Sequence, residues 1–407
     1  MNTDTANATL STQELINLEE QYGAHNYHPL DIVIDHAEGC WVYDVDGKKY
    51  LDCLSSYSAL NQGHCHPRIL STLIEQAAKV TLTSRAFRNN QLPLLYKALS
   101  DISGLSRALP MNSGAEACET AIKMARKWGY KVKGIPENQA EIIVFENNFH
   151  GRTISIISFS TEHQYKDGFG PFTPGFKIIP YDDIEAVKNA INPNTCAIFI
   201  EPIQAEAGIL IPKEGYLKQI SELCQQNNVL FIADEIQTGL GRTGKMFAFQ
   251  HENIQPDVIV VGKALSGGFY PVSAVMANDS VMGVFNPGDH GSTYGGNPLG
   301  CAVARTALEV LKDENLVERS ATLGKKFLAE LKNIQSPRIV EVRGRGLLIG
   351  IELNTKARPF CEALKAEGVL CKETHDYVIR FAPPLVVSEA DLDWALVRIK
   401  KVIESFS

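Results

Sequence analysis

Two stretches decide the fold: VLFIADEIQTG at residues 229–239 and VIVVGKALSGG at residues 258–268. Each begins as a run of apolar, mostly β-branched or aromatic residues and ends in polar residues and glycine. Two similar apolar runs, at 141–145 and 197–200, are separated from them by segments with helical patterning. Strands that are apolar on both faces and alternate with helices are typical of a mostly parallel sheet that helices cover on both sides. We therefore predict an α/β domain.

The ends of these two strands carry Asp234 and Lys263. Ligands of such sheets bind at the carboxyl ends of the strands. Taken alone, Asp234 is as consistent with a solvated acid at a strand end as with a functional carboxylate. Lys263, taken alone, fits a structural lysine with its amine at the surface. The two lie 263 − 234 = 29 residues apart, one strand–helix–strand excursion, so we expect both in one crevice. A partly desolvated lysine favours Schiff-base chemistry, and an aspartate opposite a pyridine nitrogen suits pyridoxal 5'-phosphate (PLP).

Two loops add to this chemistry. LPMNSGAEA at 109–117 leads into a predicted helix, and a small glycine-containing loop at a helix N-terminus offers N–H groups and a positive dipole end to a phosphate. NFHGRT at 148–153 places Phe149 near Arg152 in a polar turn. Each motif is weak alone, because many helices begin with Ser-Gly and a core phenylalanine often precedes a surface arginine.

The motifs together resemble the class III aminotransferases of fold type I, over essentially the whole chain. The strongest are DEIQTG at 234–239, GRTG at 241–244, KALSGG at 263–268 and GSTYGGNP at 291–298. Three more resemble the members of this class that act on ornithine: YGAHNYHPL at 22–30, SSYSA at 55–59 and NQGHCHP at 61–67. The resemblance implies a large PLP-binding domain with a sheet of the seven-stranded type and a smaller α+β domain.

The resemblance implies PLP as cofactor, with Lys263 as the Schiff-base lysine and Asp234 paired with the protonated ring nitrogen. Gln237 is implied to reach the phenolic oxygen of the ring, and Phe149 to stack on its face. His150 stands where some family members carry Trp, so we expect ring stacking to differ in detail.

The phosphate contacts implied by the resemblance come from two places. Gly114 and Ala115 hold the phosphate through backbone N–H groups, and Thr293 reaches the phosphate of a neighbouring subunit. The active unit is then a homodimer or a higher homo-oligomer, in which each site borrows from its partner.

The substrate residues implied by the resemblance serve a diamine and a dicarboxylate in one pocket. Arg380 binds the α-carboxylate of 2-oxoglutarate and Arg152 its distal carboxylate, and bidentate guanidinium pairing suits both. Glu206 is the switch that neutralises Arg380 while ornithine is bound. Tyr27 and Tyr57 hold the α-carboxylate and α-amino group of ornithine; otherwise they are packing residues of their loops.

The implied reaction is a ping-pong transfer. The δ-amino group of L-ornithine passes to 2-oxoglutarate, giving L-glutamate and glutamate 5-semialdehyde, which cyclises to pyrroline-5-carboxylate. The freed amine of Lys263 is the expected base. Ala205 stands where some family members have Gly, so the mobility of Glu206 is expected to differ in detail. A role in arginine breakdown and one in proline supply both remain open.

Three segments are predicted: residues 1–66, 67–300 as the large PLP-binding domain, and 301–407 as the small domain. The first contains a helix at 12–21 and a hairpin turned by Asp46-Gly47, and it should pack with the small domain because a lone hairpin is marginally stable. Towards the C-terminus, strand-like stretches are expected at 338–353 and 377–381. Long helices are expected at 297–312, 315–331 and 389–406.

Composition excludes several classes of function. Net charge is −8 and the basic residues are scattered, so neither a nucleic-acid groove nor a membrane-binding patch is expected. Nine cysteines without a C-x-x-C pair are typical of free thiols in a reducing cytosol. His64-Cys65-His66 matches no closed zinc pattern, so no metal is expected. Met1 to Gln21 lacks a signal or transit peptide pattern, which favours a cytoplasmic location.

Other activities share part of these motifs. Acetylornithine and 4-aminobutyrate aminotransferases have the Asp234, Lys263 and Arg380 patterns, but their donors have no use for Tyr27 and Tyr57. Side activity on lysine or N-acetylornithine stays open. A PLP-binding regulatory subunit without turnover is the alternative from a different class, and intact catalytic positions argue against it.

Overall fold

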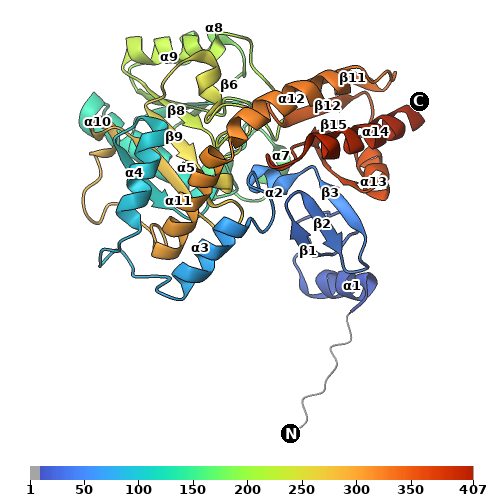
Figure 1. The fold of residues 1–407 in the computed structure, drawn as a ribbon. Coiled ribbons are helices and arrows are strands. Elements are labelled where there is room, and N and C mark those ends of the chain that lie inside the picture. The colour runs from blue at the N-terminus through green and yellow to red at the C-terminus, as the bar shows by residue number, and fades with distance from the viewer. Residues whose placement is uncertain (1–9, 407) are drawn as a thin grey trace.

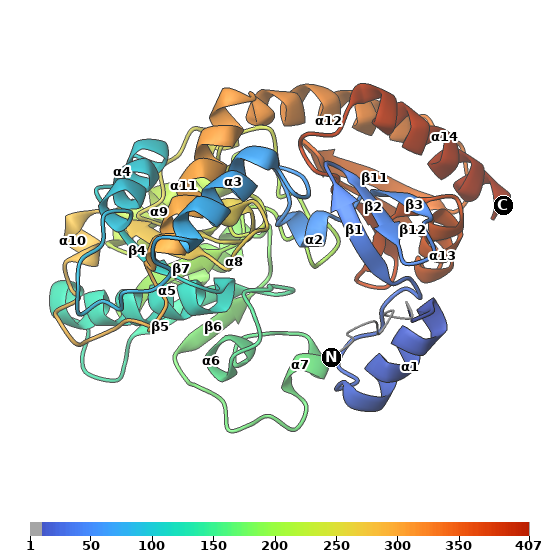
Figure 2. The same ribbon diagram turned by 60° about the horizontal axis from the view of Figure 1, so that its bottom comes forward.

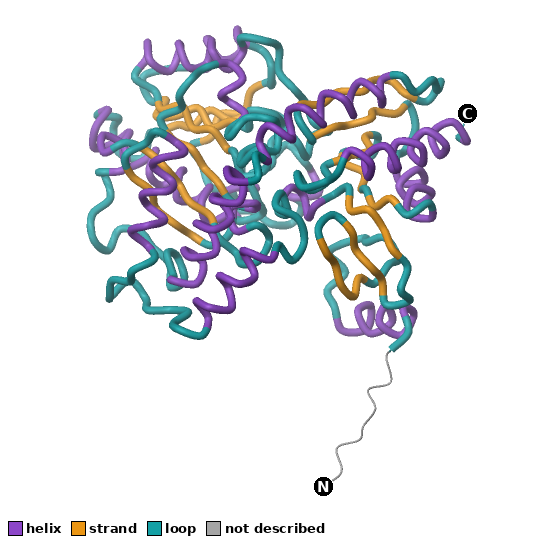
Figure 3. The backbone as a smooth tube through the Cα atoms, viewed as in Figure 1, coloured by secondary structure: helices purple, strands orange, loops and turns teal. Residues whose placement is uncertain are grey.

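The computed structural model of the protein describes residues 10–406. A seven-stranded sheet forms the centre of its larger part, to the left in Figures 1 and 3. Within these residues, β10 is antiparallel to both its neighbours and the other strands of this sheet are mutually parallel. The predicted α/β class with a mostly parallel sheet is confirmed. In order across the sheet the strands are β4 (Arg107–Met111), β10 (Ser273–Ala277), β9 (Val258–Val261), β8 (Leu230–Asp234), β7 (Thr195–Ile200), β5 (Glu141–Phe145) and β6 (Phe176–Ile179).

Both faces of this sheet are buried, as its apolar strands predict. Val258 and Val260 of β9 enter the core on one face, and Ile259 and Val261 enter the core on the other. Because successive side chains of a strand point to opposite faces, a strand covered on both sides must be apolar throughout. The covering helices are α5 (Gly114–Trp128) on the first face, and α4 (Leu92–Ser103), α8 (Ile184–Ala190), α9 (Tyr216–Asn227) and α11 (Pro298–Asp313) on the second.

A second, antiparallel sheet is built from the C-terminal part of the chain. The stretch predicted at 338–353 is a hairpin of two strands, and Ser388 caps α14 by accepting a hydrogen bond from the Asp391 N–H. In Figure 2, α12 lies between the helices of the large sheet and those of this part. The elements are β11 (Ile339–Arg345), β12 (Leu348–Leu353), β15 (Val378–Phe381), β14 (Lys372–Thr374), α12 (Leu316–Lys332), α13 (Arg358–Ala366) and α14 (Glu389–Ser405).

The N-terminal segment is joined to the C-terminal part by strand pairing. The predicted hairpin is present, and β13 (Val369–Leu370) pairs with β3 in parallel. A strand that the sequence did not suggest, β1, extends the same sheet. The elements of the N-terminal segment are α1 (Thr12–Tyr22), β1 (Ile34–Glu38), β2 (Trp41–Asp44) and β3 (Lys49–Asp52). Residues 1–9 and 407 of the predicted segments lie outside the described residues, and the domain limits at 66 and 300 stay a prediction.

The remaining helices are short connections or pack on α11. They are α2 (Ser55–Ser58), α3 (Pro67–Ala77), η1 (Gly129–Lys133), α6 (Ile154–Ile157), α7 (His163–Lys166), η2 (Ala248–Glu252), η3 (Lys263–Ser266) and α10 (Asp279–Met282). Among residues 10–406, no helix is both long enough and apolar enough to span a bilayer. All nine cysteines are free thiols, and Cys65 is the exposed one.

Candidate active site

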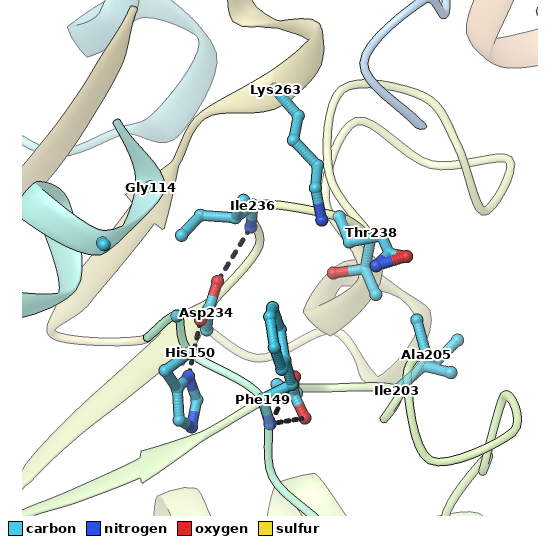
Figure 4. Close-up of a pocket in the computed structure, with 13 residues that line it drawn as sticks. Gly114, Phe149, His150, Ile203, Ala205, Asp234, Ile236, Thr238 and Lys263 are labelled. Atoms are coloured by element: carbon cyan, nitrogen blue, oxygen red, sulfur yellow. Dashed lines mark hydrogen bonds and ion pairs between the residues drawn. The ribbon is translucent and has the colours of Figure 1, made fainter. Parts of the chain in front are cut away.

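Asp234 and Lys263 lie in one cavity at the carboxyl ends of β8 and β9 (Figure 4). The side chain of Lys263 points into this cavity from the start of η3, and the Phe149 ring lies below it in the view. The cavity combines residues from loops that are far apart in the sequence. Its lining residues are Gly114, Ala115, Phe149, His150, Gly151, Glu201, Ile203, Ala205, Asp234, Ile236, Gln237, Thr238 and Lys263.

The N-terminus of α5 opens onto this cavity. A capping box uses Ser113 and Glu116: the Ser113 hydroxyl accepts from the Glu116 N–H, and the Glu116 carboxylate accepts from the Ser113 N–H. Within the described residues, the N–H groups of Gly114 and Ala115 have no hydrogen-bond partner. A Cβ at position 114 would lie 3.1 Å from Ile236, so glycine lets the backbone approach the cavity closely. This end of the helix is suited to an anion.

Asp234 is held by three neighbours on one side of the cavity. Its Oδ2 atom accepts from His150 Nδ1 at 2.6 Å and lies 3.6 Å from the Cys118 thiol, and its Oδ1 atom accepts from the Ile236 N–H at 3.0 Å. His150 is buried and its ring stacks on Phe199 with centroids 4.1 Å apart. The carboxylate therefore has a fixed orientation.

Lys263 occupies an environment that favours its neutral amine. Burial lowers the pKa of the ammonium; the Glu206 carboxylate opposes this shift and the nearby Arg380 adds to it. The residue also has φ +45°, a left-handed conformation that is strained for a side chain of this size. Strain of this kind gathers at functional sites, where the surrounding structure holds it in place.

Glu206 and Arg380 form an ion pair next to the cavity. The guanidinium of Arg380, which is buried, donates to Glu206 Oε1 at 2.7 Å, and the amide of Gln237 donates to the same oxygen at 2.9 Å. Burial alone would raise the pKa of the Glu206 carboxyl, but the charges of Arg380 and Lys263 outweigh it, and the pKa lies below its usual range. The structure thus brings together the two residues for which the resemblance implies a switch, and their switching role stays a prediction.

The other predicted substrate residues surround two adjoining cavities. Arg152 is exposed; its guanidinium lies 4.1 Å from the ring centre of Tyr165, and it shares a cavity with Tyr27. The ring of Tyr57 lies 4.7 Å from the Arg380 guanidinium, and burial raises the pKa of its hydroxyl. The structure therefore gathers Tyr27, Tyr57, Arg152 and Arg380 around the mouth of the site.

Thr293 is the one predicted site residue that stands apart from this arrangement. It is exposed, in the loop before α11, and it does not line the cavity that contains Lys263. Its predicted contact is with a neighbouring subunit, and that contact stays a prediction.

Two titratable residues of the cavity had no assigned role in the sequence interpretation. Glu201 is buried at the end of β7 and accepts from the Phe149 N–H; burial, and then the charge of Asp234, raise the pKa of its carboxyl well above the usual range. His150 contacts the Asp234 carboxylate through its Nδ1 atom. The strand-end position that singled out Asp234 applies equally to Glu201, whereas nothing in the sequence pairs His150 with Asp234.

The two histidines of the NQGHCHP motif contact different carboxylates. His64 Nε2 lies 2.8 Å from Asp52 Oδ2, and His66 Nε2 lies 2.8 Å from Glu314 Oε1, while Cys65 is exposed between them. A different trio of potential metal ligands, Cys118, His150 and Asp234, is buried beside the cavity. Its shared carboxylate oxygen already accepts from His150.

Comparisons with known proteins agree with this geometry. The profile of the family "Aminotransferase class-III" matches residues 22–403. The ornithine aminotransferase of Brevibacillus brevis is 63% identical over 392 residues, which are 96% of this chain and 98% of that protein. The structure of the ornithine aminotransferase from Toxoplasma gondii, with partial occupancy of PLP, has a TM-score of 0.97 at 45% identity and covers 98% of this chain and 95% of that one.

A solved structure with another donor in its name is also similar. The acetylornithine aminotransferase from Elizabethkingia anophelis has a TM-score of 0.90 at 51% identity, covering 98% of this chain and 100% of that one. The matched family profile, the seven-stranded sheet and the strand-end lysine and aspartate lead to one conclusion. This chain belongs to the class III aminotransferases.

Proposed function

We propose that this protein transfers the δ-amino group of L-ornithine to 2-oxoglutarate, with PLP as its cofactor. The observation that carries the proposal is the Glu206–Arg380 pair beside Lys263. A pocket that alternates between a diamine and a dicarboxylate needs a carboxylate-binding guanidinium that can be masked. The name of the Brevibacillus brevis relative supports the choice of ornithine.

The residues of the cavity fit PLP. The unpartnered N–H groups of Gly114 and Ala115 suit its phosphate, Asp234 suits its ring nitrogen, and Phe149 offers an aromatic face. Lys263 supplies an amine whose pKa is lowered. When bound, PLP provides an electron sink for the charge that develops on the carbon next to the substrate nitrogen.

Proton transfer is the work of Lys263 in this proposal. Because burial favours the neutral amine, Lys263 has a free lone pair that would accept a proton from the δ-carbon of ornithine. It would return that proton to the carbon on the other side of the substrate nitrogen. His150 fixes the orientation of Asp234, which would face the ring nitrogen, through the 2.6 Å contact with its Oδ2 atom. Gln237, now bonded to Glu206, is the proposed contact of the phenolic oxygen.

The two substrates use the same pocket in turn. While Glu206 masks Arg380, a second carboxylate has no free guanidinium, and the terminal amine of ornithine can approach Lys263 with its α-carboxylate and α-amino group held by Tyr27 and Tyr57. When Glu206 turns away, Arg380 binds the α-carboxylate of 2-oxoglutarate. The exposed Arg152 is the proposed partner of the distal carboxylate.

A second donor, N-acetyl-L-ornithine, is favoured by one observation, the likeness to the Elizabethkingia anophelis acetylornithine aminotransferase. A donor comparison tests the two. Purified protein loaded with PLP receives 2-oxoglutarate with L-ornithine, N-acetyl-L-ornithine or 4-aminobutyrate, and glutamate and pyrroline-5-carboxylate are measured. Strong turnover with ornithine that yields trapped pyrroline-5-carboxylate is expected. A preference for N-acetyl-L-ornithine would overturn the proposed donor and leave the family and the cofactor intact.

We also propose that the active unit is a homodimer, with Thr293 of each chain contacting the phosphate in the site of its partner. The exposure of Thr293 outside its own cavity supports this. Mixed dimers of Thr293→Ala and Lys263→Ala chains should retain one intact site. Mass measurements would identify the mixed dimer, and its activity would reveal the intact site.

The proposed division of the chain is 1–66, 67–300 and 301–407. The β3–β13 pairing supports packing of the first segment with the last.

A further inference from the structure

Four consecutive residues without the freedom of glycine adopt a left-handed backbone at the mouth of the site. Ser55, Ser56, Tyr57 and Ser58 have φ values of +50°, +47°, +62° and +72°. In this conformation the Cβ atom crowds the following carbonyl oxygen, so residues other than glycine visit it singly rather than in runs. A full left-handed turn therefore persists only when the structure around it imposes it.

The Asp52 carboxylate is the group that braces this turn. Its Oδ1 atom accepts from the N–H groups of Leu54 and Ser55, both at 2.8 Å, where the chain enters the turn. Its Oδ2 atom bonds His64 Nε2 at 2.8 Å, and both side chains are largely buried. One carboxylate thus satisfies two backbone donors and is itself held by an imidazole.

The brace is anchored to both smaller sheets. The backbone of His64 exchanges two hydrogen bonds with Gly39, next to the turn between β1 and β2. On the other side, the Cys53 carbonyl accepts from the Ala382 N–H at 2.6 Å, just after the strand that carries Arg380. The start of the left-handed turn is therefore held at a fixed position relative to Arg380.

The consequence falls on Tyr57, the third residue of the turn. Its ring lies 4.7 Å from the Arg380 guanidinium, within the range of a cation–π contact, and Tyr57 lines both the cavity around Arg380 and the one lined by Tyr27. If Tyr57 adopted a right-handed or extended backbone, its side chain would leave the chain in another direction. The strained backbone is what places the ring.

We propose that Asp52 and His64 are positioning residues that enforce the left-handed turn at 55–58 and thereby set Tyr57 for binding of the amino donor. Neither lines the Lys263 cavity, so neither contacts the reacting atoms. Both line the cavity that Tyr27 and Tyr57 share, and the glycine rescue at position 56 separates an effect through Tyr57 from a direct contact with the substrate. The inference rests on the proposed function, because it assigns to Tyr57 a contact with the α-substituents of ornithine.

Asp52→Ala tests the brace, and Asp44→Ala is its matched control. Asp44 is also buried, lies in the same sheet and accepts from two backbone N–H groups and a Tyr50 hydroxyl, yet it has no connection to the turn. In the loaded enzyme, Asp52→Ala should raise the KM for ornithine roughly tenfold while changing the KM for 2-oxoglutarate much less. Asp44→Ala should leave both KM values near those of the unchanged enzyme, whatever it does to thermal stability.

Glycine at the exposed position 56 provides a rescue. Because glycine adopts the left-handed region without steric cost, Asp52→Ala/Ser56→Gly should recover a substantial part of the lost affinity for ornithine, and Ser56→Gly alone should behave like the unchanged enzyme. If Asp52→Ala does not fold, His64→Ala, which removes only the outer contact, should give a smaller rise in the same KM, and Ser56→Gly should reverse it.

Two results would overturn the inference: equal effects of the brace variants on both substrates, matching those of Asp44→Ala, or no recovery on introducing glycine. Failure of the proposed function is visible separately, because the unchanged enzyme would then show little turnover with ornithine before any variant is compared. The pattern of KM changes with whichever donor is used would still report on the turn.

Discussion

At the scale of the residue, the main feature of the site is that its charged groups are buried away from water. Lys263, Glu206 and Arg380 lie close together. Burial and then the charge of Arg380 lower the pKa of Lys263, and the charges of Arg380 and Lys263 hold the pKa of Glu206 below its usual range against the effect of burial. The lysine amine is the group whose neutral form gains, because burial penalises its ammonium form. Removing any one member leaves the charge of another unbalanced, so their effects on activity should not add independently.

Lys263→Ala should abolish turnover while leaving part of the cofactor affinity. The variant loses both the attachment point and the base, so the rate with ornithine should fall by about 10⁴-fold. Binding of PLP is measured by its absorbance after gel filtration, and turnover by trapped pyrroline-5-carboxylate. Lys218→Ala, at an exposed lysine on α9, is the control and should keep full activity. Normal turnover in Lys263→Ala would exclude the assigned role.

Glu206→Ala should change the donor preference rather than abolish activity. Without its partner at 2.7 Å, Arg380 is unmasked, so donors with an α-carboxylate near the reacting amine gain access. The ratio of kcat/KM for ornithine to that for glutamate should fall by about tenfold, or 1.4 kcal/mol. Gln164→Ala, at another residue of the same cavity, is the control. An unchanged ratio would remove Glu206 from the switch.

At the scale of the element, the carboxyl end of β8 is held by the side chain of Glu235, which accepts hydrogen bonds from the residues around it. Glu235, directly after β8, is fully buried and accepts from the Thr238 hydroxyl and from the Phe249 N–H in η2. Burial raises the pKa of its carboxyl to about 7, and hydrogen bonds from Thr238 and from the backbone of η2 oppose part of that rise. The residue that directly follows Asp234 is therefore a titratable group that the proposed chemistry does not use.

The pH dependence of stability follows from Glu235. Between its ordinary pKa and the folded value of about 7, the unfolded chain releases a proton that the folded protein keeps, so the free energy of unfolding falls as the pH rises through this window. Glu235→Gln does not titrate. Its free energy of unfolding, relative to the unchanged protein, should therefore improve by about 2 to 3 kcal/mol from pH 5 to pH 8.

Urea unfolding at the two pH values measures this difference. Glu214→Gln, at an exposed glutamate, should show no such change between pH 5 and pH 8. A relative stability of Glu235→Gln that is the same at both pH values would mean that Glu235 is ionised in the folded protein throughout.

At the scale of the whole molecule, Arg242 connects three parts of the chain that are distant in sequence. It is fully buried, and its guanidinium donates to Asn61 Oδ1 and to the carbonyl oxygens of Leu347 and Pro383. Burial lowers the pKa of this guanidinium to about 9. One side chain thus joins the N-terminal segment, the loop after β8 and the C-terminal part.

Arg242→Met should destabilise the protein by about 3 to 5 kcal/mol, because it leaves buried acceptors without a donor. The unfolding free energy in urea measures the loss, and the transition should also become less cooperative as the parts separate. Arg107→Met is the control: Arg107 pairs with Asp279 at the surface, where both side chains are mostly exposed, and its loss should change stability little. Equal effects of the two variants would contradict the role of Arg242.

The sequence by itself determined the large sheet and the position of its chemistry. Strands such as 258–261 are apolar on both faces, which is possible only where helices cover both sides, and Asp234 and Lys263 had to follow at the strand ends. The capped helices starting after Ser113 and Ser388 were likewise predictable from local residue types. These features depend on residues close together in the chain.

Only the tertiary structure decided the contacts between distant segments. The His150–Asp234 bond, the Arg242 junction and the left-handed turn that carries Tyr57 join residues far apart in sequence or impose a backbone that the residue types disfavour. Serine and tyrosine have no preference for the left-handed region, so no local pattern reveals that turn. Burial and long-range hydrogen bonds supply the free energy for it, and these exist only once the sheets have packed.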